Sequence, residues 1–433
     1  MTDKQKKLME ELLQENLLVS TGCTEPIAIA YASAIARRYL EEEPSKIFLR
    51  ISKNMAKNAM DAGIPNSDYV GAAFVSALGA LFGDSTKGFQ LLEGLSKQQH
   101  DEAYKFAKEN VQIEIADTDK ALYIEVRMDG VELKVCNTDR CCNTSVKVIV
   151  ADGHKSINRI EKNGKVILDM SIKHNNEQEE SRNEVDFSMK EIFEYARQLT
   201  DFSLFEQAVN INKKLSEEGQ KENTKWGLNV GKITPFGEET KVSRILSVVA
   251  SAVDARMAGA DFPAVACTGS GNQGITTTLP VYQVGMELNS TKEEILKAVA
   301  ISDLTAIYVK RNLNVLSYLC GAVIASCGAS AGITYLMGGD YEKAEYAVKN
   351  VLSSVTGMFC DGAKITCALK VLACVNTAIY SSMMAINENG KIVKKVGIAR
   401  KSLADTIRNI AKIESETTEI MDKTIMEIIV KAE

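Results

Sequence analysis

The spacing of the hydrophobic residues changes twice along this chain, and that change constrains the fold more than any other feature. In residues 1–94 and again in residues 223–433, apolar residues recur every three or four positions, the period of an amphipathic helix. In residues 101–201 they alternate with polar residues, the period of a strand. The sequence therefore predicts an α+β fold, with a large, mainly α-helical body built from both chain ends and interrupted by a smaller domain of mixed helix and strand. The expected boundaries are 1–95 and 220–433 for the body and 96–219 for the inserted domain.

Short turn signals separate the predicted strands of the middle zone. Asp129-Gly130, Asp152-Gly153 and Asn163-Gly164 each have the composition of a hairpin turn, because both residue types tolerate positive φ. The charged run of residues 174–184, HNNEQEESRNE, is typical of a solvated loop.

Charge and segment composition exclude several classes of protein. The 433 residues carry a net charge of −6, and the 51 basic residues are scattered among 57 acidic ones, so no positive field favours nucleic acid as a partner. Residues 1–18 alternate charges with leucines at helical spacing and lack the apolar core of a signal peptide, which predicts a cytoplasmic protein. Residues 312–339 carry no charge, but their Gly, Ala, Ser and Cys content predicts a buried core helix and no membrane span.

The chain has ten cysteines, which a reducing compartment keeps free as packing residues, metal ligands or reactive thiols. Cys360, Cys367 and Cys374 are seven residues apart, and so are Cys320 and Cys327, which predicts that each set shares one helix face. Free cysteine is commonly buried, so we expect most of them to be small packing groups.

Histidine is scarce, and all three histidines lie outside the predicted helical body, which disfavours histidine-based triads there. The cysteines of the middle zone have no CxxC pair and no nearby histidine, so their spacing does not favour a zinc site. These are Cys136, Cys141 and Cys142. Proton chemistry must therefore use other groups, and the acids and bases nearest the Gly- and Cys-rich segments are Glu25, Lys57, Asp254, Asp361 and Lys364.

The segment GCTEP, residues 22–26, has the composition of a turn leading into a helix, since proline is tolerated in the first helical turn. Cys23 would then lie at the positive end of the helix dipole, which lowers the pKa of a thiol and favours the metal-binding thiolate. A buried thiol beside an ordinary helix cap is the equally weighted alternative.

The segment GSGNQG, residues 269–274, matches the letters of a dinucleotide-binding loop, but its context argues against that interpretation. The preceding apolar run is short, and Pro280 lies where a long helix should follow. A loop whose backbone N–H groups, with Ser270 and Asn272, bind a small carboxylate fits better, and a tight turn between packed helices is the structural alternative.

Taken in order, six segments of the chain resemble the L-cysteine desulfidase family, which is related to the iron–sulfur L-serine dehydratases. They are GCTEP, the run NMAKNAMDAGIPN at residues 54–66, VDARMAG at residues 253–259, GSGNQG, the Cys-Gly start of the core helix, and CDGAKITC at residues 360–367. The resemblance covers nearly the whole chain and is loose only between residues 101 and 201. It implies a carbon–sulfur lyase with a helical catalytic body.

The resemblance implies a [4Fe-4S] cluster held by Cys23, Cys320 and Cys360, with one iron left open for the substrate. The sequence departs from the family pattern at Cys267 before the glycine loop and at Val253 before the DARM run. Cys267 could therefore compete as a ligand, and Cys367 could take the place of Cys360. No pyridoxal phosphate site is evident, because we find no Schiff-base lysine beside a phosphate-binding loop.

The resemblance also implies a small amino-acid substrate. If its sulfur is fixed at iron, its carboxylate is left to the glycine loop and its ammonium to an acid such as Glu25. The general base is expected to be Lys57 or Lys364, with Tyr69 as another candidate. The residues expected to bind the substrate are Thr24, Asn54, Asn58, Ser270, Gly271, Asn272 and Gln273.

The leading hypothesis is a cluster-dependent lyase that converts L-cysteine to hydrogen sulfide, ammonia and pyruvate, since a soft thiol suits iron. Dehydration of L-serine is the alternative within the same chemistry. A non-catalytic sensor that binds a cluster is the alternative of another class. A homodimer is expected from the large apolar helical content.

Overall fold

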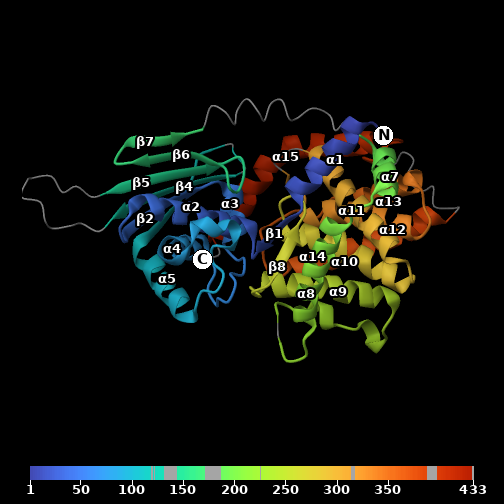
Figure 1. Cartoon of the computed structure of the whole chain (residues 1–433), viewed down its shortest axis with the longest axis horizontal. Coiled ribbons are helices and arrows are strands. Elements are labelled where there is room, and N and C mark those ends of the chain that lie inside the picture. Colours follow the sequence, from blue (N-terminus) through green and yellow to red (C-terminus); the bar gives the residue numbers. More distant parts are fainter. Residues whose placement is uncertain are drawn as a thin grey trace, which may run out of the picture.

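The computed structural model describes residues 1–118, 120, 122–130, 144–170, 187–224, 226–313, 317–387 and 397–431. They form two lobes, one built on a β-sheet and one almost wholly helical, with the long helix α15 (Leu403–Lys431) running between them (Figure 1). This arrangement confirms the predicted α+β class with a large helical body.

The first lobe is a six-stranded sheet with the strand order β3-β2-β4-β5-β6-β7, covered by the helices α2 (Thr24–Leu40), α4 (Ala72–Phe82) and α5 (Lys97–Asn110). Among the described strands of this sheet, only the β2–β3 pair is parallel. Along β4, buried and less buried residues alternate, because successive side chains point to opposite faces of a sheet. The strands are β2 (Pro44–Ile51), β3 (Val111–Ile115), β4 (Tyr123–Gly130), β5 (Ser145–Ala151), β6 (Ile157–Lys162) and β7 (Lys165–Asp169).

The second lobe packs its helices around α12 (Gly321–Leu336), in which residues 322–334 are all buried. The predicted core helix within residues 312–339 is therefore confirmed. A short antiparallel pair, β1 (Leu18–Thr21) with β8 (Pro263–Ala266), lies at its edge. The other helices of this lobe are α1 (Asp3–Asn16), α7 (Met189–Gln198), α8 (Ser203–Gln220), α9 (Lys241–Met257), α10 (Gly271–Glu287), α11 (Lys292–Arg311), α13 (Tyr341–Ser354) and α14 (Cys367–Ile386).

The remaining elements are short. Helix α3 (Lys53–Ala59) begins at Ser52, whose Oγ accepts a hydrogen bond from the backbone of Met55. Three 3₁₀ helices complete the described structure, namely η1 (Ser85–Gln90), η2 (Val230–Lys232) and η3 (Pro235–Gly237).

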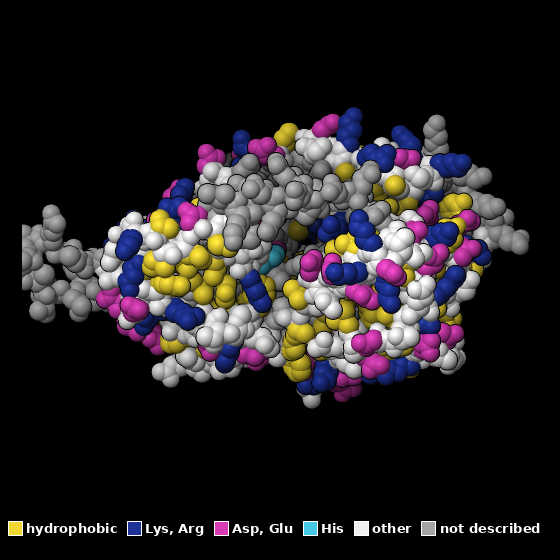
Figure 2. Space-filling model, turned by 45° about the horizontal axis from the view of Figure 1, so that its top comes forward, with side chains coloured by type: hydrophobic (Ala, Val, Ile, Leu, Met, Phe, Trp, Pro, Cys, Tyr) yellow, Lys and Arg dark blue, Asp and Glu magenta, His cyan; other side chains and the backbone are white. Residues whose placement is uncertain are grey.

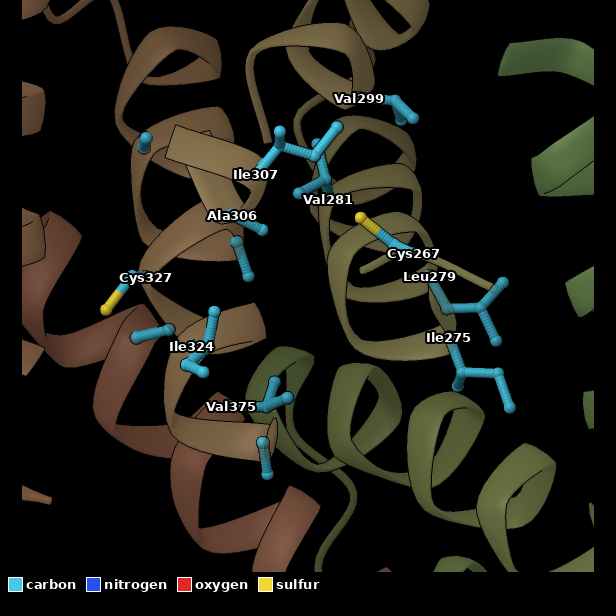
Figure 3. Close-up of a cluster of buried hydrophobic side chains, with 14 of the residues drawn as sticks. Cys267, Ile275, Leu279, Val281, Val299, Ala306, Ile307, Ile324, Cys327 and Val375 are labelled. Carbon is cyan, nitrogen blue, oxygen red and sulfur yellow. The ribbon is translucent and has the colours of Figure 1, made fainter. Parts of the chain in front are cut away.

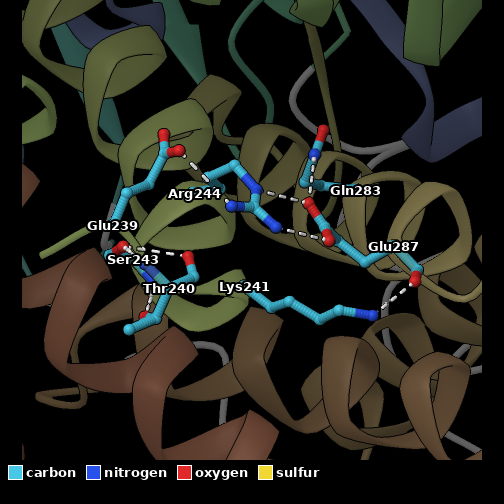
Figure 4. Close-up of polar contacts among 7 residues, drawn as sticks. All are labelled: Glu239, Thr240, Lys241, Ser243, Arg244, Gln283 and Glu287. Carbon is cyan, nitrogen blue, oxygen red and sulfur yellow. Dashed lines mark hydrogen bonds and ion pairs between the residues drawn. The ribbon is translucent and has the colours of Figure 1, made fainter.

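An ion pair on the surface of the helical lobe joins the start of α9 to the end of α10. Arg244 donates from Nε and Nη2 to the two carboxylate oxygens of Glu287, at 2.8 and 2.9 Å (Figure 4). Lys241 donates to the backbone carbonyl of Glu287 beside it. A bidentate guanidinium–carboxylate pair fixes orientation as well as distance, so these contacts set how the two helices cross.

Among the described residues, one helix, α14, is long and apolar enough to cross a membrane by length and composition, and 44% of its most apolar window is buried. A core helix of a globular protein has the same properties. On the face shown in Figure 2, basic and acidic side chains are interspersed, and a hollow lies between the two lobes.

The predicted turns have different outcomes. Asn163 and Gly164 both have positive φ, at 52° and 76°, and join β6 to β7 as expected. Asp152 has φ of 66° and begins the loop from β5 to β6. Residues 131–143, which contain Cys136, Cys141 and Cys142, and residues 174–184 lie outside the described residues, so those two predictions stay untested.

The buried hydrophobic residues form two clusters, one in each lobe. The sheet lobe takes in residues 27–92 together with the strands, and β2 (Pro44–Ile51) lies inside the sheet although its segment was assigned to the helical zone. That assignment of β2 was wrong, because a single strand among helices is too short to change the periodicity of a long segment. The boundaries 1–95, 96–219 and 220–433 themselves remain a prediction.

Candidate active site

The candidate site is built at the N-terminal ends of several helices. Cys23 is the N-cap of α2, Ser270 that of α10, and Cys320 that of α12, while Cys367 is the first residue of α14. The turn predicted at GCTEP is confirmed, with Gly22 at φ 77°. The first N–H groups of a helix have no intrahelical partner and carry partial positive charge, so this is a suitable place for an anionic group.

A buried arginine joins two of these helix ends. Arg256, from the VDARMAG segment in α9, donates from Nη2 to the carbonyl of Gly22 and from Nη1 to Oδ1 of Asn272, at 2.8 and 2.9 Å. Thr24 adds a hydrogen bond to the carbonyl of Gly269, at 3.1 Å. GCTEP and GSGNQG, far apart in sequence, are therefore held side by side.

The chain segments before α12 and α14 form a second connection. Leu319 and Phe359 form an antiparallel bridge, the N–H of Cys320 donates to Met358, and the N–H of Cys360 donates to Tyr318. Because Cys320 and Cys360 each follow one member of the bridged pair, alternation places both side chains on the same face. The two segments named by the family resemblance thus come together.

The thiols of this group influence one another. Burial raises the pKa of Cys320 far above its usual value, and the neighbouring Cys360 raises it further. Burial also raises the pKa of Cys23 to about 11, although Arg256 beside it acts in the opposite direction. The expectation that the helix dipole lowers the pKa of Cys23 is therefore wrong for the metal-free chain, because desolvation of the thiolate outweighs the dipole.

Cys367 belongs to the same group, since it acts on the pKa of both Cys23 and Cys320. The predicted helix face shared by Cys360, Cys367 and Cys374 is wrong, because α14 begins only at Cys367 and Cys360 lies in the extended segment before it. A seven-residue spacing places two side chains on one face only if both residues lie in the same helix, and Cys360 lies before α14.

Other cysteines are packing residues, as expected. Cys327 in α12 and Cys267 after β8 are both fully buried among aliphatic side chains (Figure 3). Cys267 lies in this hydrophobic core with Leu279 and Val281, and not with the group around Cys320. The structure therefore gives no support to Cys267 as a competing ligand.

The donor set fits an iron–sulfur cluster better than a single ion. Among the described residues, no three His, Cys, Asp or Glu side chains are close enough to hold one metal ion. Each cysteine of a cluster binds a different iron, so its ligands stand further apart than those of one ion. Cys23 and Cys320 are buried thiols at helix N-termini, and Cys360 is a partly exposed thiol beside Cys320. With Arg256 next to Cys23, this set suits an anionic cluster of this kind.

A cavity of about 140 Å³ lies beside this group. Cys360 lines it together with four predicted site residues, Asn54, Lys57, Asn58 and Gln273. Its small size suits a molecule much smaller than a drug-like ligand. The rest of the lining is Lys310, Ser317, Leu319, Gly321, Ile324 and Asp422.

The two lysines expected as general bases lie in different surroundings. Lys57 is buried in the cavity wall and donates from Nζ to Oδ1 of Asp422 at 2.6 Å. Lys364 is partly exposed, pairs with Asp361 and does not line the cavity.

The other candidates for proton transfer and ammonium binding also have partners. Glu25 accepts a hydrogen bond from Thr24 at 2.9 Å. Tyr69 donates to Asp101 on the surface of the sheet lobe, and this hydrogen bond raises its pKa.

The glycine loop differs from its prediction. Residues 271–287 form one long helix, α10, which contains Pro280. The prediction that no long helix follows GSGNQG was therefore wrong. Thr268 and Gly269 have positive φ and turn the chain sharply between β8 and α10. Among the described residues, the strand before this turn pairs only with antiparallel β1, so no parallel βαβ unit surrounds GSGNQG.

Three residues of the site were missed from the sequence. The VDARMAG segment was noted, but nothing in it showed that Arg256 is buried and joins two loops. Lys310 and Asp422 come from α11 and α15, which carry no motif, so only the tertiary structure brings them to the cavity.

Comparison with known proteins now assigns the class. The model of a family of lyases, described as the serine dehydratase alpha chain, matches residues 87–427. A UPF0597 protein of Bacteroides thetaiotaomicron is 36% identical over 99% of this chain and 98% of its own length. UPF0597 proteins of Clostridium perfringens strain SM101 and Porphyromonas gingivalis are 36% and 32% identical, each over at least 98% of both chains.

The chain belongs to the serine dehydratase alpha chain family. The predicted relationship to the iron–sulfur serine dehydratases is thereby confirmed at the level of the family. The family match does not distinguish cysteine from serine as the substrate.

Proposed function

We propose that this protein is a [4Fe-4S]-dependent lyase that converts L-cysteine to hydrogen sulfide, ammonia and pyruvate. The observation that carries the proposal is that the N-cap residues Cys23 and Cys320 lie in one group with Cys360, which also lines a small polar cavity. We propose these three as the cluster ligands. The open iron of the bound cluster would supply a Lewis acid for the departing sulfur.

The chain's own residues would orient the amino acid. Asn54, Asn58 and Gln273 line the cavity with amides, which both donate and accept hydrogen bonds. Gln273 packs against Gly321, where an added Cβ would approach its side chain to 2.8 Å, so this wall leaves no room for a larger residue. With a volume of about 140 Å³, the cavity suits a small amino acid.

Elimination also requires removal of the α-proton. Lys57 is the candidate general base that borders the cavity, but its ammonium is already hydrogen-bonded to Asp422. An ammonium cannot accept a proton, so Lys57 would first have to pass one proton to Asp422, and the neutral amine would then take the α-proton. The elimination product, aminoacrylate, hydrolyses to pyruvate and ammonia without further help from the protein. We place this activity in the cytoplasm.

Dehydration of L-serine is a second candidate, favoured by the family match itself. The two activities differ in the leaving atom, and soft sulfur suits iron better than a hydroxyl does. Release of sulfide from L-cysteine and of pyruvate from L-serine, compared on protein reconstituted without oxygen, distinguishes them. Higher kcat/KM for L-serine would replace the first proposal with the second.

Iron and acid-labile sulfide analysis tests the cluster. We expect Cys23→Ala, Cys320→Ala and Cys360→Ala each to lose most of their iron and all turnover. Cys327→Ala is the matched control, because Cys327 is equally buried in α12 but lies outside the group. Cys367→Ala tests whether Cys367 is the third ligand. If this variant loses iron and Cys360→Ala keeps it, Cys367 takes the place of Cys360 as the ligand. Full iron in the four variants other than the control would refute the cluster assignment.

A further inference from the structure

The charges that line the cavity do not balance. Lys57 and Asp422 form a pair in which both residues are at most 8% exposed. Lys310, from the last turn of α11, lines the same cavity, and the described residues give it no hydrogen bond or ion pair. Burial lowers the pKa of Lys310, and the charge of Glu414 opposes this. Among the described residues, however, Lys310 has no carboxylate within ion-pairing distance, and Oε1 of Glu414 accepts a hydrogen bond from Ser317.

An unpaired charge in a partly desolvated site is costly, and a carboxylate would offset that cost. The cavity has the charge of an anion-binding site even before any cluster is considered. A small α-amino acid that enters it brings one such carboxylate.

The glycine loop is less able to take this role than its sequence suggests. Asn272 accepts from Arg256 and donates to the sulfur of Met257, and Oε1 of Gln273 accepts from Thr268. At Gly271 an added Cβ would lie 2.4 Å from the guanidinium of Arg256, so the arginine covers the start of α10. The side chains of the loop are engaged in holding the site together.

We propose that Lys310 binds the α-carboxylate of the substrate amino acid and so selects carboxylate-bearing thiols. This inference rests on the proposed function and assigns the carboxylate to α11 instead of the glycine loop. With the substrate sulfur towards Cys360 and its carboxylate at Lys310, the amino acid would lie across the cavity that these two residues border. Lysine acts here as a point charge with three donors.

The test compares two thiols that differ only in the carboxylate, L-cysteine and cysteamine, on anaerobically reconstituted enzyme. Binding is measured by calorimetry, and the visible spectrum is recorded in parallel. We expect Lys310→Met to weaken the binding of L-cysteine about ten- to a hundredfold, the value of a charge-assisted hydrogen bond. The affinity for cysteamine should change less than about twofold. Lys310→Arg should recover part of the loss. Lys297→Met is the control, because Lys297 lies on the same helix but pairs with Glu293 away from the cavity.

Each outcome decides between the two proposals. Equal weakening of both thiols by Lys310→Met, or an unchanged affinity for L-cysteine, would overturn the role of Lys310. Binding of L-cysteine that depends on Lys310 but leaves the spectrum unchanged would overturn the binding of the substrate sulfur at the open iron and keep the carboxylate site. Failure of L-cysteine to bind the wild-type enzyme would overturn both.

Discussion

At the scale of single residues, a buried carboxyl group inside the helical lobe makes the stability of the protein depend on pH. Asp303, in α11, is completely buried, and neither of its carboxyl oxygens has a hydrogen-bond partner among the described residues. Burial raises the pKa of Asp303 to about 7, while its neighbours Thr277 and Cys267 act in the opposite direction. This carboxyl lies beside Cys267, just before the turn that begins α10, and beside Thr277 within α10.

The raised pKa of Asp303 makes stability depend on pH. Its contribution is fully present below the unfolded pKa near 4 and is lost as the pH rises through the folded pKa near 7, by about 1.4 kcal/mol for each pH unit in that window. We expect Asp303→Asn to raise the melting temperature of the apoprotein more at pH 7.5 than at pH 5. An equal shift at both pH values would mean that Asp303 does not titrate in this range.

At the scale of elements, close helix contacts depend on small residues. Gly79 of α4 faces Ala30 of α2, and an added Cβ would lie 2.2 Å from the carbonyl oxygen of Ala30. That atom belongs to the backbone, so the helices themselves would have to separate. The alanine-rich sequences of α2 and α4 suit this close contact, because small side chains let two helix backbones come near each other.

We expect Gly79→Ala to destabilise the protein by about 1–3 kcal/mol, the range for overpacking a core. The measurement is chemical denaturation of the two proteins side by side. Gly357→Ala is the control, since a Cβ at Gly357 meets no atom within 4 Å. A cost no larger than that of the control would show that the helices can move apart freely.

Helix α10 shows why one element escaped prediction. Its run of three threonines and Pro280 predicts a strand or loop, because β-branched residues and proline are poor helix formers. In the structure, the hydroxyl of Thr276 donates a hydrogen bond to the backbone carbonyl of Asn272, and that of Thr278 donates to the backbone carbonyl of Gly274. Burial against α11 and α12 then stabilises a helix that local propensity disfavours.

At the scale of the whole molecule, α15 connects the lobes. Leu403, Ile407 and Ile410 pack into the core of the helical lobe, while Met426 packs into the core of the sheet lobe. Between these two contacts, Asp422 reaches Lys57 of α3 in the cavity wall. The last helix of the chain therefore holds together both lobes and the site between them.

This connection predicts a measurable coupling. Asp422→Asn leaves a buried ammonium without its partner, and we expect a loss of about 3–5 kcal/mol in stability. The double variant Lys57→Met with Asp422→Asn should be less destabilised than the sum of the two single variants. Melting temperatures of the four proteins give the coupling, and strict additivity would mean that the pair does not act as a unit.

The sequence by itself determined the α+β class, the helix that begins at Cys23, the buried helix α12 and most of the polar residues around the cavity. These follow from periodicity, from local turn chemistry and from the family resemblance, each of which is contained in a short segment or in the order of segments. The tertiary structure alone decided that Arg256 joins two loops, that the wall of the cavity comes from α11 and α15, and that burial raises the pKa of the Cys23 thiol. Those features depend on which distant residues share one low-dielectric space, and no local pattern in the chain encodes that.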